Sequence, residues 1–232
     1  MPHTLTAAAE TRLSQRGPLP LDPTAAIAIK RDVHEFEIDA DADAFARAFA
    51  EAMADPDASF GLIRIRRSAR HSGTSFAVGE RFQGCFSLEA ALLGALRGRP
   101  RARRLAERLL ARPAAARLVG WIEDSMLSDY GEIVDLDDGA GAHRLRYRYL
   151  DGTPIAGSSI FEVEPLGPGR CRVRQVFEYQ EVNAVALGTF QRFGLKFHDQ
   201  VVHMQIAAAA QRCGARVLRG TIPAAYAAAG RA

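Results

Sequence analysis

The apolar and polar positions near the end of the chain fit one long helix. Between Gly188 and Gly214, large apolar residues recur at steps of three and four: Phe190, Phe193, Phe197, Val201 and Met204. This spacing places their side chains on one stripe of an α-helix, and such a stripe must be buried against another element. The sequence therefore predicts a long terminal helix that packs on the rest of the fold.

Before this helix, alternating apolar and polar residues predict seven strands. The clearest alternation is at 143–150, where Leu145, Tyr147 and Tyr149 face one way and arginines face the other. The other six strands are expected at 33–38, 60–67, 76–88, 130–136, 155–164 and 171–181. Tight turns such as Asp151-Gly152 join several of them, so consecutive strands should pair antiparallel.

Two further regions of the sequence have helical patterns. Phe45, Phe49 and Met53 follow the first strand at four-residue spacing and predict an amphipathic helix. A helical insertion is expected at 89–121, and seven arginines lie between 97 and 112. We interpret these arginines as a solvated helix face, because the aromatic residues that would stack on nucleic-acid bases are missing. A lid that contacts an anionic partner is the alternative.

Composition and charge narrow the class of protein. The chain has 232 residues, 48% of them hydrophobic, which is enough for a sizeable core. The net charge of +3 is small and most arginines are scattered, so no nucleic-acid partner is expected. Three widely spaced cysteines without a CxxC pair indicate neither a disulfide framework nor a zinc site. No signal peptide or spanning apolar run is present, so we expect a cytoplasmic protein without integral membrane association.

The order of elements predicts an α+β fold. A curved antiparallel seven-stranded sheet should wrap around the long C-terminal helix, leaving an apolar space between them. We expect one domain over 25–219, preceded by a flexible or loosely docked arm at 1–24 and followed by a flexible tail at 220–232. The oligomeric state stays open, with a homodimer as one alternative.

Four segments carry a resemblance to a known group of proteins: 36–40, 78–82, 159–164 and 197–210. Their order over residues 33–213 resembles the START-like superfamily, which has the helix-grip fold of lipid-transfer START domains, Bet v 1-like plant proteins and polyketide cyclase-like proteins. The chain departs from the usual pattern in having one helix after the first strand, where two are common, and in its insertion. The resemblance implies that a hydrophobic molecule binds between sheet and helix, in carriers and sensors as well as in cyclases or dehydratases.

Glu80 is the candidate catalytic residue. The alternation at 76–88 places it on the same strand face as Phe76 and Phe82. If that face is inward, desolvation would raise the pKa of the carboxyl, as a general acid or base requires. An ion pair with an arginine is the alternative.

Other polar residues are candidates for orienting a ligand. Tyr147 and Tyr149 either line a pocket with their hydroxyls or belong to an aromatic core. Gln175 lies beside Phe177 on an apolar strand face, and an inward amide needs a partner, which is a ligand or ordered water. The expected ligand-binding residues are Glu80, Phe82, Tyr130, Tyr147, Tyr149, Gln175, Phe177, Phe193 and Phe197.

No metal or cofactor is expected. Asp199 and His203 are four residues apart on the predicted helix, but a metal site needs a third ligand and no HExxH spacing appears. We interpret them as a surface pair, and His198 as a packing residue. The sequence thus predicts binding or transport of a hydrophobic small molecule that is lipid-like or aromatic and polyketide-like. The alternatives are a cyclase or dehydratase acting through Glu80 in the same cavity, and an interaction module built on the basic insertion.

Overall fold

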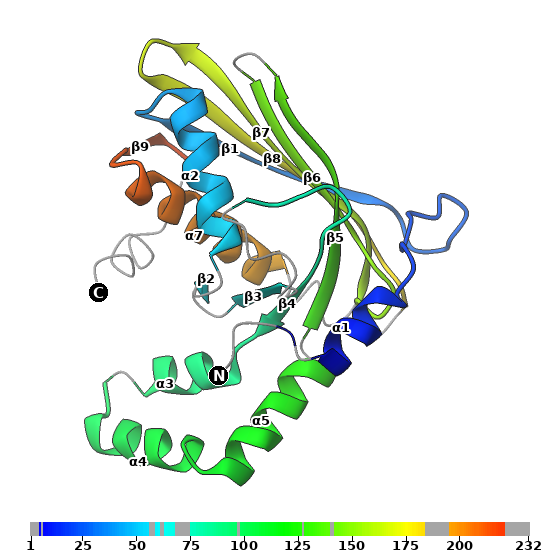
Figure 1. Cartoon of the computed structure of the whole chain (residues 1–232), viewed down its shortest axis with the longest axis vertical. Helices are drawn as coiled ribbons and strands as arrows, with labels where there is room; N and C mark the ends of the chain where they lie inside the picture. The colour runs from blue at the N-terminus through cyan, green and yellow to red at the C-terminus, as the bar shows by residue number, and fades with distance from the viewer. Residues whose placement is uncertain are drawn as a thin grey trace.

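A strongly bent antiparallel sheet forms the body of the protein (Figure 1). The computed structural model describes residues 5, 7–55, 59–60, 63–67, 75–96, 98–126, 128–139, 142–183 and 195–220. Within these residues the sheet has nine strands in the order β2-β3-β4-β5-β6-β7-β8-β1-β9. Their bounds are β1 Lys30–Ile38, β2 Ser59–Phe60, β3 Ile63–Arg67, β4 Arg81–Phe86, β5 Ser128–Gly139, β6 Ala142–Tyr149, β7 Ile155–Gly167, β8 Arg170–Glu181 and β9 Val217–Arg219.

The predicted α+β class and helix-grip arrangement are confirmed, whereas the count of seven strands is wrong. The strand expected at 60–67 is two short strands, β2 and β3, and β9 adds a strand that pairs with β1. Strands of two or three residues are too short to show a period of two, so alternation cannot reveal them.

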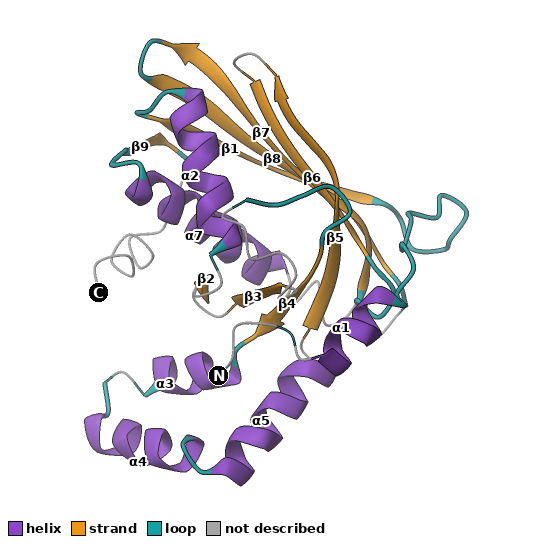
Figure 2. Ribbon diagram, viewed as in Figure 1, coloured by secondary structure: helices purple, strands orange, loops and turns teal. Residues whose placement is uncertain are grey.

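Two helices lie together on the concave side of the sheet (Figure 2). They are α2 Ala42–Ala54 and α7 Leu195–Arg212, and the main core lies between them and the sheet. On α2, Phe45, Phe49 and Met53 are buried, as their four-residue spacing predicts. The main core thus fills the space between these two helices and the sheet.

Helix α7 confirms the long terminal helix but presents a different face. Val202, Ile206 and Ala209 are almost fully buried, whereas Val201 and Met204 are only half-buried at the margin. The buried face is therefore displaced by about one residue, or roughly 100° around the helix. Val201 and Met204 of the predicted stripe still pack against the core. The predicted stripe residues Phe190 and Phe193 lie outside the described residues.

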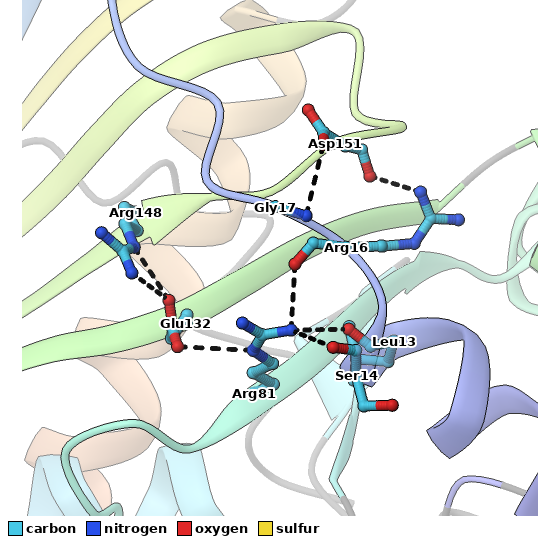
Figure 3. A network of polar contacts seen from close by, with 8 residues as sticks. All are labelled: Leu13, Ser14, Arg16, Gly17, Arg81, Glu132, Arg148 and Asp151. Carbon is cyan, nitrogen blue, oxygen red and sulfur yellow. Dashed lines mark hydrogen bonds and ion pairs between the residues drawn. The ribbon is translucent and has the colours of Figure 1, made fainter.

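Part of the N-terminal segment, expected as a flexible or loosely docked arm at 1–24, is a helix that packs on the sheet. Residues Ala7–Ser14 form helix α1, and Leu13 is buried with Leu5 and Leu150 on the sheet face opposite α2 and α7. The Arg81 guanidinium donates hydrogen bonds of 2.9–3.0 Å to three backbone carbonyls at the end of this helix, those of Leu13, Ser14 and Arg16 (Figure 3). Carbonyls at a helix end lack intrahelical donors, so a cation there satisfies them.

Three helices stand between β4 and β5, as the helical insertion predicts. They are α3 Leu88–Ala95, α4 Pro100–Leu110 and α5 Pro113–Met126, so the helical part extends past residue 121. They project from the end of the molecule where β3 and β4 lie (Figure 1). Leu105, Leu118 and Trp121 on these helices are about 60% exposed. Whether the insertion acts as a lid stays a prediction.

Across the described part of the chain, no helix is both long and apolar enough to span a membrane. Of the predicted C-terminal tail, only Gly220 is among the described residues.

Candidate functional site on the concave face

Polar side chains form a band across the concave face of the sheet. Tyr147 of β6 pairs with Ser159 of β7, and His34 of β1 pairs with Gln175 of β8. Pairing partners and alternate residues of a strand share one face, so these side chains all lie on the side of α2 and α7. With two neighbours, the polar band consists of Asp129, Tyr147, Ser159, Gln175, His34 and His198.

The polar band separates two apolar clusters. Along β8, Val173 belongs to the main core, Gln175 follows, and Phe177 belongs to a second cluster. The second cluster is aromatic: the Phe177 ring stacks on Tyr179 with centroids 4.5 Å apart and meets Tyr149 at 6.0 Å. Polar groups placed between apolar walls are typical of ligand sites.

Gln175 and His198 form the centre of the band. Gln175 is fully buried, and its Nε2 donates a 2.7 Å hydrogen bond to Ser159 Oγ and lies 3.4 Å from His198 Nε2. Its Oε1 has no hydrogen-bond partner among the described residues. Such a buried acceptor costs on the order of 1–3 kcal/mol unless another group satisfies it.

The His198 imidazole is held in place by the Phe177 ring, with centroids 4.0 Å apart and planes 19° from parallel. Burial, with a smaller contribution from the charge of His34, lowers the pKa of His198 to about 3. His198 is therefore neutral at physiological pH and offers one nitrogen lone pair.

Asp129 and two tyrosines form the other end of the band. Burial raises the pKa of Asp129 to about 6. Burial also raises the pKa of Tyr147, against hydrogen bonds to Ser159 and Tyr149 that lower it. Burial raises the pKa of Tyr149 well above its usual value, and the Tyr147 and Asp129 charges add to the effect. A carboxyl that titrates near neutral pH therefore stands beside two neutral phenols.

Glu80 is buried, but not on a strand and not free. The strand expected at 76–88 begins only at Arg81, and Val78 is 61% exposed in the preceding turn. Arg67 binds the Glu80 carboxylate in a bidentate manner, with Nε–Oε1 at 2.5 Å and Nη2–Oε2 at 2.9 Å. The backbone N–H of Ala77 donates to Oε2 at 3.1 Å. Glu80 thus forms the ion pair with an arginine that was the alternative to a catalytic role. Both of its carboxylate oxygens accept hydrogen bonds from Arg67.

Phe82 and Tyr130 lie on opposite faces of the sheet. The Phe82 ring covers Gly131, where a Cβ atom would overlap it, and packs edge-on against Tyr147 at 5.3 Å. Tyr130 carries the Arg16 guanidinium 3.7 Å over its ring and lines a recess of about 10 Å³ beside α1, with room for about one water. The expectation that Tyr130 shares a site with Tyr147 is therefore wrong, because Tyr130 alternates with the inward-facing Asp129.

The other predicted ligand-binding residues divide in two groups. Tyr147, Tyr149, Gln175 and Phe177 come together on the concave face. Phe193 lies outside the described residues, and Phe197 lies in α7 without a described side chain. Sequence reasoning missed Asp129, whose only signal is its place one residue before the strand expected at 130–136.

Four side chains at the β1 end of the band could hold a metal ion. One ligand atom from each of Asp32, His34, His198 and Asp199 lies within 4.8 Å of all the others. His34 Nε2 is 3.2 Å from Asp32 Oδ2 and 3.3 Å from Asp199 Oδ1. The sequence showed no third ligand near Asp199. In the structure the additional candidate ligands are His198, which was expected only to pack, and Asp32 and His34 of β1, which are distant in the chain. His203, predicted to pair with Asp199, packs edge-on against His34 at 5.6 Å.

Comparison with known proteins identifies the fold. No protein-family model matches the sequence, and no match was found among curated proteins. Among solved structures, the Zhui aromatase/cyclase from Streptomyces sp. R1128 superposes with a TM-score of 0.50 and 11% identity, covering 80% of this chain and 96% of its own. Norcoclaurine synthase from Thalictrum flavum, solved with dopamine and hydroxybenzaldehyde, superposes with a TM-score of 0.48 and 13% identity, covering 84% of this chain and 95% of its own. Major latex-like protein 151 from Panax ginseng superposes with a TM-score of 0.41 and 14% identity, covering 77% of this chain and 96% of its own.

Such low identities show a shared fold alone. The chain has the Bet v 1-like helix-grip fold that the order of its elements predicts.

Proposed function

We propose that the protein binds a hydrophobic small molecule between the concave face of the sheet and α7, with the polar band orienting it. One observation carries this proposal. Asp129, Tyr147 and His198 are desolvated strongly enough to shift their pKa values, yet all three keep accessible surface. Groups that are surrounded by protein and still accessible border internal space, and the aromatic cluster supplies apolar walls to it.

The polar groups indicate the chemistry of the ligand. The unpartnered Gln175 Oε1 can accept a hydrogen bond from a ligand hydroxyl. The Tyr147 hydroxyl stays protonated and can donate to a carbonyl. Aromatic walls and one donor–acceptor pair favour a flat aromatic or polyketide-like molecule over a plain acyl chain. The structural similarity to an aromatase/cyclase is compatible with the proposal of such a ligand for this protein.

Two substitutions on opposite faces of the sheet test the proposal. Tyr147→Phe removes the inward hydroxyl and keeps the ring, whereas Tyr130→Phe makes the same change on the far face. Binding of hydroxynaphthaldehyde probes is followed by calorimetry and fluorescence. We expect Tyr147→Phe to weaken the binding affinity up to about tenfold, because the loss of one hydrogen bond has about that effect. Tyr130→Phe should leave the affinity unchanged.

Native mass spectrometry of protein purified from its own host provides an independent readout. A retained small molecule that Gln175→Leu loses would support the proposal. Absence of any retained molecule, together with no probe binding or equal effects of the two tyrosine substitutions, would overturn it.

A second candidate function is a cyclase or dehydratase in the same space. It is favoured by Asp129, since a carboxyl whose pKa is about 6 can exchange a proton near neutral pH. Tyr147 beside it would polarise a substrate carbonyl. Glu80 is the weaker candidate, because Arg67 occupies both its oxygens. An enzyme should lose turnover in Asp129→Asn while still binding the probes, whereas a carrier has no turnover to lose.

A further inference from the structure

We propose that Asp32, His34, His198 and Asp199 form a binding site for one divalent transition-metal ion, of which Zn²⁺ is the best match. The site lies at the β1 end of the polar band and does not depend on the small-molecule function proposed above.

The fold brings the four ligands together from two distant elements. Asp32 and His34 are two apart on β1, so their side chains lie on the same face. His198 and Asp199 are consecutive on α7. The His34 ring packs against the His198 ring, with centroids 5.9 Å apart, and this contact joins the two pairs. Because Asp32 and His198 are 166 positions apart in the chain, no short motif marks the site.

The distances fit metal coordination. Zinc binds imidazole nitrogen and carboxylate oxygen at about 2.0–2.2 Å, so tetrahedral ligands stand roughly 3.3–3.5 Å apart. His34 Nε2 lies 3.2 and 3.3 Å from its two carboxylate oxygens, which matches two such edges. The largest separation in the cluster, 4.8 Å at most, needs only a modest side-chain rotation to close.

Unsatisfied nitrogens are a second, independent observation. His34 Nε2 and His198 Nδ1 are fully covered and make no hydrogen bond within the described part of the chain. For His34 this holds although two carboxylates are close, because neither lies in hydrogen-bonding geometry. Buried polar atoms without partners are rare in folded proteins, and a bound ion is one of the groups that satisfies them. A metal ion would satisfy such lone pairs without needing a linear N–H···O arrangement.

Charge also favours a cation. Among the described residues, Asp32 and Asp199 form ion pairs with His34, and neither forms an ion pair with a lysine or arginine. An ion pair of His34 with the two carboxylates is the competing arrangement, and it would exclude a metal from the same place. Imidazole together with carboxylate suits zinc, iron, cobalt and nickel.

Metal binding by the full-length protein tests the inference. Protein treated with a chelator and then dialysed is titrated with Co²⁺, whose visible absorption reports four-coordinate nitrogen and oxygen ligands, and then with Zn²⁺ in competition. We expect about one ion per chain and displacement of Co²⁺ by Zn²⁺. His34→Gln and Asp199→Asn should each weaken binding at least tenfold. His143→Gln, which alters a histidine paired with Asp43 away from the cluster, is the matched control and should bind normally.

The outcomes decide clearly. Stoichiometric binding that both cluster variants lose, with native circular dichroism and the control unaffected, supports the site. If a variant is misfolded, wild type alone provides the test. Its histidines are labelled with diethyl pyrocarbonate with and without Co²⁺, and mass spectrometry should show that Co²⁺ protects His198 from modification. Absence of a stoichiometric Co²⁺ spectrum in the folded wild type, or equal binding by His34→Gln, overturns the proposal.

Discussion

Asp129→Asn should remove a pH-dependent loss of stability. Burial raises the pKa of this carboxyl from its ordinary value of 3.8 to about 6 in the folded protein. Between these values the folded state holds a proton that the unfolded state has released. Folding is therefore favoured most below pH 3.8, and this contribution falls as the pH rises towards 6.

The magnitude follows from the shift. A rise in the pKa of Asp129 from 3.8 to about 6 corresponds to about 3 kcal/mol of lost stability when the carboxyl is ionised. Because Asp129 keeps some accessible surface, water screens part of this cost, and 3 kcal/mol is an upper limit. Asparagine has nearly the same shape and cannot ionise. The variant should match wild type near pH 4 and exceed its stability by up to about 3 kcal/mol above pH 7.

Urea unfolding followed by circular dichroism at pH 4, 5, 6, 7 and 8 measures this effect. Asp137→Asn, an exposed position on the same strand, serves as control and should change stability by less than about 0.5 kcal/mol throughout. Parallel stability curves for Asp129→Asn and wild type would refute the reasoning. They would mean that water solvates Asp129 freely, and the space proposed beside it would lose its main support.

Three further substitutions test the packing around the site. Glu80→Gln should destabilise by about 3–5 kcal/mol in urea unfolding, because it removes the carboxylate charge that pairs with the buried Arg67 guanidinium; replacing both residues with Met should recover most of the loss. Gly131→Ala should cost about 1–3 kcal/mol through overlap with Phe82, and failure of Phe82→Leu to restore stability would reject that contact as the cause. Arg81→Gln should release α1, at a cost of about 1.5–3 kcal/mol, and trypsin should then cleave the N-terminal segment faster; an unchanged cleavage rate would contradict the capping role.

Local patterns were informative where a residue's surroundings follow from its own strand or helix. The alternation at 143–150 placed Leu145, Tyr147 and Tyr149 on one face, and all three lie inward. The same reasoning was wrong for Glu80, because the peptide before Arg81 is a turn and not a strand. On α7 the predicted stripe residues Val201 and Met204 pack against the core at its margin, whereas Val202, Ile206 and Ala209 are the most deeply buried.

The sequence by itself determined the α+β class, the order of the elements and the inward faces of the long strands, because hydrophobic periodicity within one element needs no information from another. Only the tertiary structure decided which side chains meet. Pairing of β1 with β8, and packing of α7 across them, bring His34 to Gln175 and His198. Such contacts join residues more than a hundred positions apart, and they depend on register and helix rotation, which no local pattern records.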